Sequence, residues 1–291
     1  MQAKQLAAAL FISAFSLFSA FSSVSAQTPE KQYRKHKIRS VYFSWGYNEE
    51  WYTKSTLHVD QYALGNNFDL IHVLAHDNRG WNYQFFQQQL TIPQYNYRLG
   101  FYINEKQDLA IEVNFDHTKY NLNDGQYINV SGTINHQPAT GNLLFSAQNG
   151  FYYYLDNGAN FLLFNIVKRL GIYHTYDYKL HFDFTGKAGI GPVIPHVENS
   201  FFGYENEEKF QVGGWNTGVE TALRATFLHY GYLEFSQKVD YARYSNLEIY
   251  GGTAKQNFGT YELILSAGVI IPTSHKTPMF FSENKTAEEN K

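Results

Sequence analysis

The fold is decided by residues 94–120, which read QYNYRLGFYINEKQDLAIEVNFDHTKY. In the first half of this segment, apolar and aromatic residues fill every second position: Tyr95, Tyr97, Leu99, Phe101 and Ile103. In the second half the same spacing returns: Leu109, Ile111, Val113 and Phe115. A period of two is the signal of a β-strand, and the polar residues 104–108 join the two strands as a hairpin. The opposite faces of both strands are polar and carry Arg98 and Glu112.

The same alternation recurs in six further segments: 41–47, 161–170, 180–191, 219–227, 233–241 and 261–271. Together these make about eight strands of roughly 9–12 residues, the length that crosses a bilayer when a strand is tilted. The connections alternate between short turns (104–108, 173–178, 229–231) and long polar segments (48–90, 121–158, 192–215, 242–257). Short periplasmic turns and long extracellular loops are typical of transmembrane barrels. The sequence therefore predicts an all-β, antiparallel, up-and-down transmembrane β-barrel of about eight strands.

Two alternatives stay open at this point. Ten strands are possible if Phe68–Asp77 and part of 81–90 form an additional hairpin of the barrel. A soluble, lipocalin-like barrel that binds a ligand also fits the alternation, because a period of two does not reveal which face meets water.

The composition narrows the class of protein. The chain has 291 residues, of which 18% are aromatic and 17% charged, with no cysteine and a net charge of −3. The absence of cysteine excludes a disulfide framework. The near-neutral charge gives no support for a nucleic-acid partner, and the aromatic content argues against disorder.

The N-terminal residues predict export. Lys4 precedes an apolar run at Leu6–Phe21, and Val24-Ser25-Ala26 is a small-residue cleavage site. The expected organisation is a signal peptide (1–26), a basic linker (27–37), an outer-membrane β-barrel (38–272) and a polar C-terminal tail (273–291). The expected location is the outer membrane.

Several stretches carry a resemblance to a known class: Phe43–Asn48 (FSWGYN), Phe68–Leu70 with Val73, Ala75, Asp77 and Arg79, Thr91–Arg98 (TIPQYNYR), Asp116–Tyr120 (DHTKY) and Gly186–Gly191 (GKAGIG). Over most of the mature chain, the sequence resembles a poorly characterised group of small outer-membrane β-barrel proteins of Gram-negative bacteria. The resemblance implies an outer-membrane barrel and brings no catalytic residue with it. The chain departs from that class at its end, because such barrels commonly finish on an aromatic residue. Here about 20 residues follow the last predicted strand, so either they form a periplasmic tail or Phe280-Phe281 belongs to another strand.

The polar faces of the predicted strands gather eight charged residues: Arg98, Glu112, Asp183, Lys187, Glu220, Arg224, Glu234 and Lys238. If these side chains point into a narrow barrel, they must pair, since an unpaired buried charge is costly. We expect them to form a salt-bridged network that plugs the lumen. A narrow polar pore is the alternative.

The long segments are rich in aromatic and amide side chains, which suit contact with carbohydrate or protein. The binding candidates are Trp51, Tyr52, Trp81 and Tyr83. The expected role is structural, or interaction through the extracellular loops of a monomer. The expected partners are outer-membrane lipid and lipopolysaccharide, with a protein or glycan at the loops and no nucleic acid.

No catalytic residue, metal site or cofactor is predicted. His72 and His76 are four residues apart, which on a strand separates them by about 13 Å, too far for one metal ion. The second hypothesis is a lipid-modifying enzyme of the lipid A deacylase or acyltransferase kind, with Ser245 as nucleophile and His117 or His196 as base. No sequence pattern places either histidine beside that serine.

Overall fold

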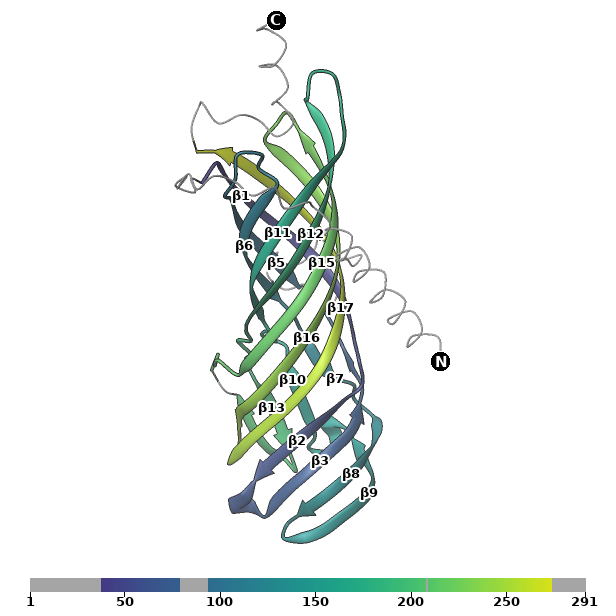
Figure 1. The fold of residues 1–291 in the computed structure, drawn as a ribbon. Helices are drawn as coiled ribbons and strands as arrows, with labels where there is room; N and C mark the ends of the chain where they lie inside the picture. Colours follow the sequence, from purple (N-terminus) through teal and green to yellow (C-terminus); the bar gives the residue numbers. More distant parts are fainter. Residues whose placement is uncertain (1–37, 79–93, 208, 274–291) are drawn as a thin grey trace, which may run out of the picture.

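The computed structural model describes residues 38–78, 94–207 and 209–273. Eight antiparallel strands form a closed ring (Figure 1): β1 (Ser40–Tyr52), β5 (Tyr95–Tyr102), β6 (Leu109–His117), β11 (Phe161–His174), β12 (Leu180–Pro192), β15 (Gly214–Phe227), β16 (Gly231–Ile249) and β17 (Gly252–Pro272). The ring closes because β1 pairs with β5 on one side and with β17 on the other. The predicted fold class and the strand number of eight are confirmed.

Side chains of the ring strands alternate between the outside and the lumen. Leu99 and Leu223 face outward and are 41% and 56% exposed, whereas the side chains of Asn114 and Thr226 face inward and are fully buried. A protein whose outside is apolar and whose inside is polar fits lipid as its surroundings, because the apolar surface is then kept out of water. The soluble-barrel alternative requires the opposite arrangement.

Three short connections, at 103–108, 175–179 and 228–230, lie at one end of the ring. The two ends of the described barrel meet there as well, because the Thr273 hydroxyl donates to the Ile38 carbonyl over 2.8 Å. Three long connections leave from the opposite end, which the asymmetry of transmembrane barrels places outside the cell. The fourth predicted long segment, 242–257, is instead the end of the hairpin of β16 and β17, which turns at Tyr250-Gly251.

The long connections are not the irregular loops that their polar composition indicates, and the structure corrects that expectation. Four of their strands continue the barrel sheet beyond β17 in the order β2 (Ser55–Gln61), β3 (Asn66–Val73), β8 (Gln126–Ile134) and β9 (Gln137–Phe145). Five others form a second sheet: β4 (Ala75–His76), β7 (Tyr120–Leu122), β10 (Tyr152–Leu155), β13 (Glu198–Phe201) and β14 (Tyr204–Glu207). We call these nine strands, with the outer ends of β16 and β17, the cap. Two short 3₁₀ turns, at Tyr62–Leu64 and Ala147–Asn149, connect its strands.

The cap has an apolar core of its own. In β2, Leu57 and Val59 point into this core while His58 between them points out, and in β3 Phe68 and Leu70 point inward in the same way. The inward rings meet others from the second sheet: Phe68 lies 6.3 Å from Phe201 between ring centroids. Because Phe68 belongs to the cap, the additional barrel hairpin of the ten-strand alternative is not formed by β3.

Among the described residues, no helix is long and apolar enough to cross a membrane. The predicted signal peptide, the basic linker and Phe280-Phe281 lie outside the described residues, as do Trp81 and Tyr83.

Charge placed on the outward face should disturb the barrel. Leu99 lies on β5 between Tyr97, toward the cap, and Phe101, toward the short turns. Arginine there has neither water nor a partner, so Leu99→Arg is expected to cost roughly 2–4 kcal/mol near the bilayer midplane. The measurement is the free energy of unfolding by urea in lipid vesicles.

Tyr127→Arg is the matched control, because Tyr127 is 76% exposed on the cap strand β8. A substitution at such an exposed position is expected to change stability by less than about 0.5 kcal/mol. Equal costs at Leu99 and Tyr127 would contradict a lipid-facing wall.

Candidate functional site

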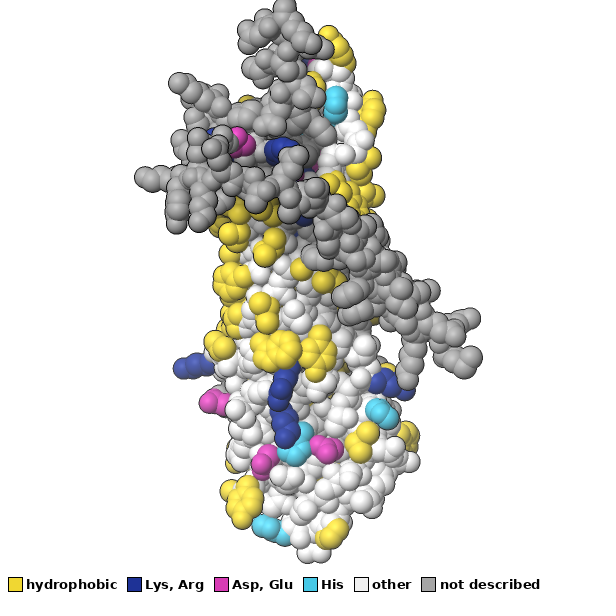
Figure 2. All heavy atoms as spheres, in the orientation of Figure 1, with side chains coloured by type: hydrophobic (Ala, Val, Ile, Leu, Met, Phe, Trp, Pro, Cys, Tyr) yellow, Lys and Arg dark blue, Asp and Glu magenta, His cyan; other side chains and the backbone are white. Residues whose placement is uncertain are grey.

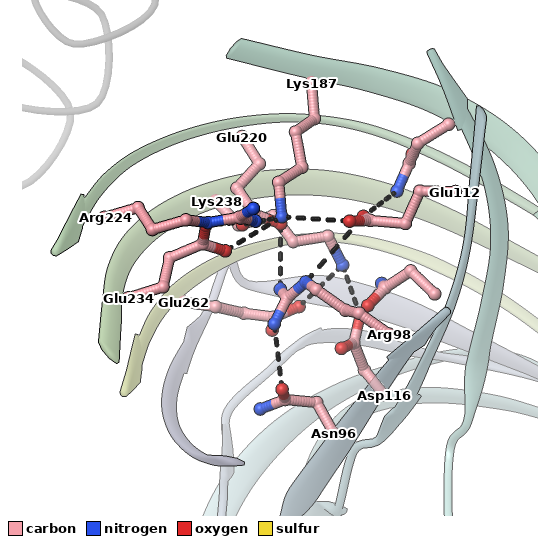
Figure 3. A network of polar contacts seen from close by, with 12 residues as sticks. Asn96, Arg98, Glu112, Asp116, Lys187, Glu220, Arg224, Glu234, Lys238 and Glu262 are labelled. Atoms are coloured by element: carbon pink, nitrogen blue, oxygen red, sulfur yellow. Dashed lines mark hydrogen bonds and ion pairs between the residues drawn. The ribbon is translucent and has the colours of Figure 1, made fainter. Parts of the chain in front are cut away.

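The centre of the lumen is a network of buried ion pairs built around Lys187 on β12 (Figure 3). The Lys187 ammonium lies 3.3 Å from Glu112, 3.1 Å from Glu220 and 3.0 Å from Glu234. These carboxylates come from β6, β15 and β16, so one ammonium connects four strands across the lumen. All four side chains are at most 2% exposed.

Two arginines complete this layer. Arg98 on β5 donates to Glu220 over 2.8 Å and to the Asn96 side-chain carbonyl over 2.8 Å. Arg224 on β15 donates to Glu234 over 2.7 Å, and its guanidinium lies 4.1 Å from the ring centroid of Tyr232. The side chains therefore satisfy most of one another's charge, which is the condition under which buried ions are tolerated.

A second cluster lies nearer the cap and surrounds Lys238 on β16. The Lys238 ammonium donates to Asp116 and lies 2.8 Å from Asp240 and 3.4 Å from Glu262. Toward the short turns, a third group pairs Arg169 with Asp183 over 2.6 Å, beside His181. The three groups lie at successive levels of the barrel along its strands.

The structure buries all eight residues inferred from sequence and divides them among the three groups: Arg98, Glu112, Lys187, Glu220, Arg224 and Glu234 lie in the central layer, Lys238 in the second cluster and Asp183 in the third group. It also adds Arg169 and Glu262, which the sequence reasoning missed. Asp116 and Asp240 were on the polar faces that the alternation defined, but their role as partners of Lys238 was not recognised. The available signal was the period of two: Asp116 is four residues from Glu112, and Asp240 is two residues from Lys238.

Beyond Lys238 the lumen changes from charged to aromatic. Along β17 the inward side chains are Glu262, Thr260 and then Phe258, whose ring stacks on Tyr120 at 4.2 Å and on Tyr244 at 5.4 Å between centroids. The Tyr244 hydroxyl donates to the Ala159 carbonyl over 2.7 Å and so ties β16 to the residues before β11. This aromatic layer lies at the junction of barrel and cap.

The cap interior is buried and mainly apolar. Burial raises the pKa of the Tyr153 phenol, which belongs to the second sheet of the cap. Tyr52, one of the binding candidates, points inward at the base of the cap and donates a hydrogen bond to the Lys119 carbonyl over 2.6 Å. Trp51 points outward at the level where the barrel meets the cap and is 43% exposed.

The histidines do not assemble a reactive centre with the serine named above. The His117 ring nitrogen Nδ1 lies 2.9 Å from the Asn160 side chain, and His196 Nε2 lies 3.9 Å from Glu207. Neither makes a hydrogen bond with Ser245 in the part of the chain that the structure describes. Within those same ranges, no three His, Cys, Asp or Glu side chains gather as metal ligands. His76 instead contacts Asn123 over 2.7 Å.

Comparison with known proteins gives likenesses of fold. No family model matches the sequence, and no curated protein matches it. Among solved structures, Ail of Yersinia pestis in complex with a heparin analogue is 12% identical and covers 81% of this chain and 100% of its own, with a TM-score of 0.31. The outer membrane protein OprG of Pseudomonas aeruginosa is 10% identical over 81% of this chain and 97% of its own, with a TM-score of 0.36. The outer membrane protease OmpT of Escherichia coli is 10% identical over 86% and 99%, with a TM-score of 0.33.

At these identities and TM-scores, the likenesses assign no activity to this chain. The class of protein follows from the molecule itself: a ring of eight antiparallel strands, closed by β1 and β17, with an apolar outside and charged side chains inside. That arrangement is the transmembrane β-barrel, and the chain is an outer-membrane protein of this class.

Proposed function

We propose that this protein is a closed barrel that conducts no ions and presents its cap as a rigid surface outside the cell. Its role is structural or lies in interaction through the cap, with a protein or glycan as partner. One observation carries the proposal: the inward side chains of β17 belong to two different groups along the barrel. Glu262 is part of the ion-pair cluster around Lys238, and Phe258, nearer the cap, is part of the aromatic layer. The lumen is thus filled at two levels by different chemistry.

The first level is closed by electrostatics. A hydrated ion that enters the lumen must displace Lys187 or Lys238 from carboxylates 2.8–3.4 Å away, and both side chains are at most 2% exposed. Breaking such a pair leaves an uncompensated charge in a site of low dielectric constant, which costs several kcal/mol. A conducting pore needs the opposite: binding weak enough for ions to leave.

The rigid cap supports a role in interaction. A surface made of paired strands loses little conformational entropy when a partner binds, whereas a mobile loop must first be ordered. The outer face of the cap sheet is polar, with Asn129, Ser131, Asn257 and Thr253 exposed on it. Such side chains provide hydrogen bonds to glycans and to proteins alike.

Conductance tests the closed barrel. Purified protein in planar bilayers is expected to show no large, steady ion current. Arg98→Ala should stay closed as well, because the aromatic layer around Phe258 lies on the cap side of Arg98 and does not depend on it. An open porin in the same bilayers is the positive control.

A reproducible current whose ion selectivity changes on Arg98→Ala or Glu112→Ala would favour the polar pore. That result would show ions passing through the network itself.

A further inference from the structure

On one side of the molecule, the barrel wall runs without a break into the cap. The strands β16, β17, β2, β3 and β8 are neighbours in a single sheet, and its outer face is open from the barrel to the far end of the cap. Figure 2 shows Lys and Arg side chains directly beyond a band of large hydrophobic ones. Three exposed basic residues belong to this part of the chain: Lys54, Arg243 and Lys255.

The hydrophobic band includes two aromatic pairs. Trp51 on β1 lies 5.8 Å from Tyr261 on β17, and Trp215 on β15 lies 5.8 Å from Tyr241 on β16, between ring centroids. Aromatic girdles of this kind mark the two membrane–water interfaces of a transmembrane barrel. These pairs lie at the cap end of the barrel, so they mark the outer interface.

Arg243 and Lys54 lie just beyond this girdle. Arg243 is two residues from Tyr241 along β16, about 7 Å further out, and its backbone pairs with Trp215 on one side and Asn257 on the other. Lys54 follows Thr53, whose amide donates to the Gly259 carbonyl over 2.9 Å. Because one strand, β17, runs between them, their Cα atoms are about 10 Å apart.

These cations have no partner among the residues that the structure describes. Neither Lys54, Arg243 nor Lys255 forms a side-chain hydrogen bond or ion pair with any residue of the described ranges. At the opposite rim, three cations are paired: Arg39 with Glu105 over 2.9 Å, Lys168 with Asp108 over 2.6 Å and Lys179 with Asp177 over 3.0 Å. Neighbouring cations that are both without an ion pair among the described residues are found where the outer leaflet's headgroups lie, at Lys54 and Arg243.

The acidic groups on this face, Asp60, Asp69 and Glu49, form no ion pair with Lys54, Arg243 or Lys255. Asp69 is held by His58, with 2.7 Å between its carboxylate and His58 Nδ1. Glu49 lies on the membrane side of Trp51, two residues further from Lys54. Neither carboxylate makes an ion pair with Lys54 or Arg243.

We propose that Arg243 and Lys54 bind the phosphate groups of a phosphorylated glycolipid of the outer leaflet, with Lys255 in reach of its more distal anionic groups. Arginine suits this task because its guanidinium donates two parallel hydrogen bonds to phosphate, while lysine acts as a compact charge. The lipid's acyl chains lie against the aromatic pairs, and its sugars face the exposed amides and hydroxyls of the cap sheet. This inference rests on the proposed function in placing the cap outside the cell, and it does not depend on the closed lumen.

Binding of lipid A in micelles of a neutral detergent tests the site. Bisphosphorylated lipid A is titrated against the full chain, with dephosphorylated lipid A as the comparison. Each basic residue near an anionic lipid contributes enough for about a fivefold change in affinity, so Arg243→Gln with Lys54→Gln should weaken binding about thirtyfold. This double variant should bind bisphosphorylated and dephosphorylated lipid A with about equal affinity.

Lys106→Gln with Lys179→Gln is the matched control, because it removes the same charge from exposed positions at the short-turn end. This control should bind bisphosphorylated lipid A as the unchanged protein does. Equal loss in both double variants would show attraction by overall charge and would overturn the site. Equal affinity of the unchanged protein for the two lipid forms would overturn recognition of phosphate, and full displacement by inorganic phosphate would indicate a site for free anions instead of lipid.

The fold and the lumen are checked separately. Both double variants should keep the heat-dependent gel migration of a folded barrel and should remain closed in planar bilayers. A current in the unchanged protein would contradict the closed lumen and leave the lipid site standing. If the unchanged protein shows no current and does not bind lipid A, the lipid site is contradicted and the closed lumen is left standing.

Discussion

Lys187→Met is expected to destabilise the barrel by about 3–5 kcal/mol, because it removes the one ammonium that Glu112, Glu220 and Glu234 share. Methionine fills a similar volume, so the loss reports charge more than packing. The carboxylates that remain are fully desolvated and close to one another. The measurement is the free energy of unfolding by urea in lipid vesicles, followed by tryptophan emission.

Two further variants make this result specific. Lys179→Met removes an ammonium that is paired with Asp177 at the surface, where the two side chains are 61% and 51% exposed, and should cost no more than about 1 kcal/mol. Adding Glu112→Gln to Lys187→Met should recover part of the loss, since one uncompensated charge disappears. If Lys187→Met costs no more than Lys179→Met, the network contributes no more than a surface pair.

The barrel was predictable where each strand has one polar and one apolar face. In β5, Arg98 and Leu99 are neighbours in sequence and lie on opposite sides of the wall, so the period of two gives both the strand and its orientation. Arg169 was missed because the inward face of β11 is mixed: Leu163 and Val167 also point into the lumen. Glu262 shares its face with Ile264 in the same way. Where apolar and charged side chains share the inward face, the contrast between the two faces of the strand is weaker and the alternation is harder to recognise.

The cap was not predicted, although part of its signal is local. In β2 the outward Thr56, His58 and Asp60 alternate with inward Leu57 and Val59, but the segment is short and lies in a long polar stretch. What makes it a sheet is non-local. His58 pairs with Lys255 across almost 200 residues, and no local pattern specifies such a partner.

Phe68→Ala is expected to loosen the cap and to leave the barrel intact. Phe68 is 1% exposed and its ring packs against Phe201 and Phe202, at 6.3 and 5.8 Å between centroids. Removing a buried phenylalanine ring costs about 3–5 kcal/mol, through lost burial and the cavity left behind. The cap core is separate from the ion-pair network, so the loss should appear as local opening of β2, β3 and β8.

Hydrogen exchange of backbone amides distinguishes the two parts. In Phe68→Ala, protection should fall in β2, β3 and β8 and stay unchanged in β5 and β6, and protease added outside vesicles should cut the cap. Tyr127→Ala is the matched control, because it removes an aromatic ring from the same sheet at a position that is 76% exposed, and it should leave protection as it was. Equal loss of protection in cap and barrel strands would mean that they unfold as one unit. A cap that opens alone also predicts that interaction through its surface can be abolished without removing the protein from the membrane, because the eight-strand ring closes through β1 and β17 and does not need the cap core.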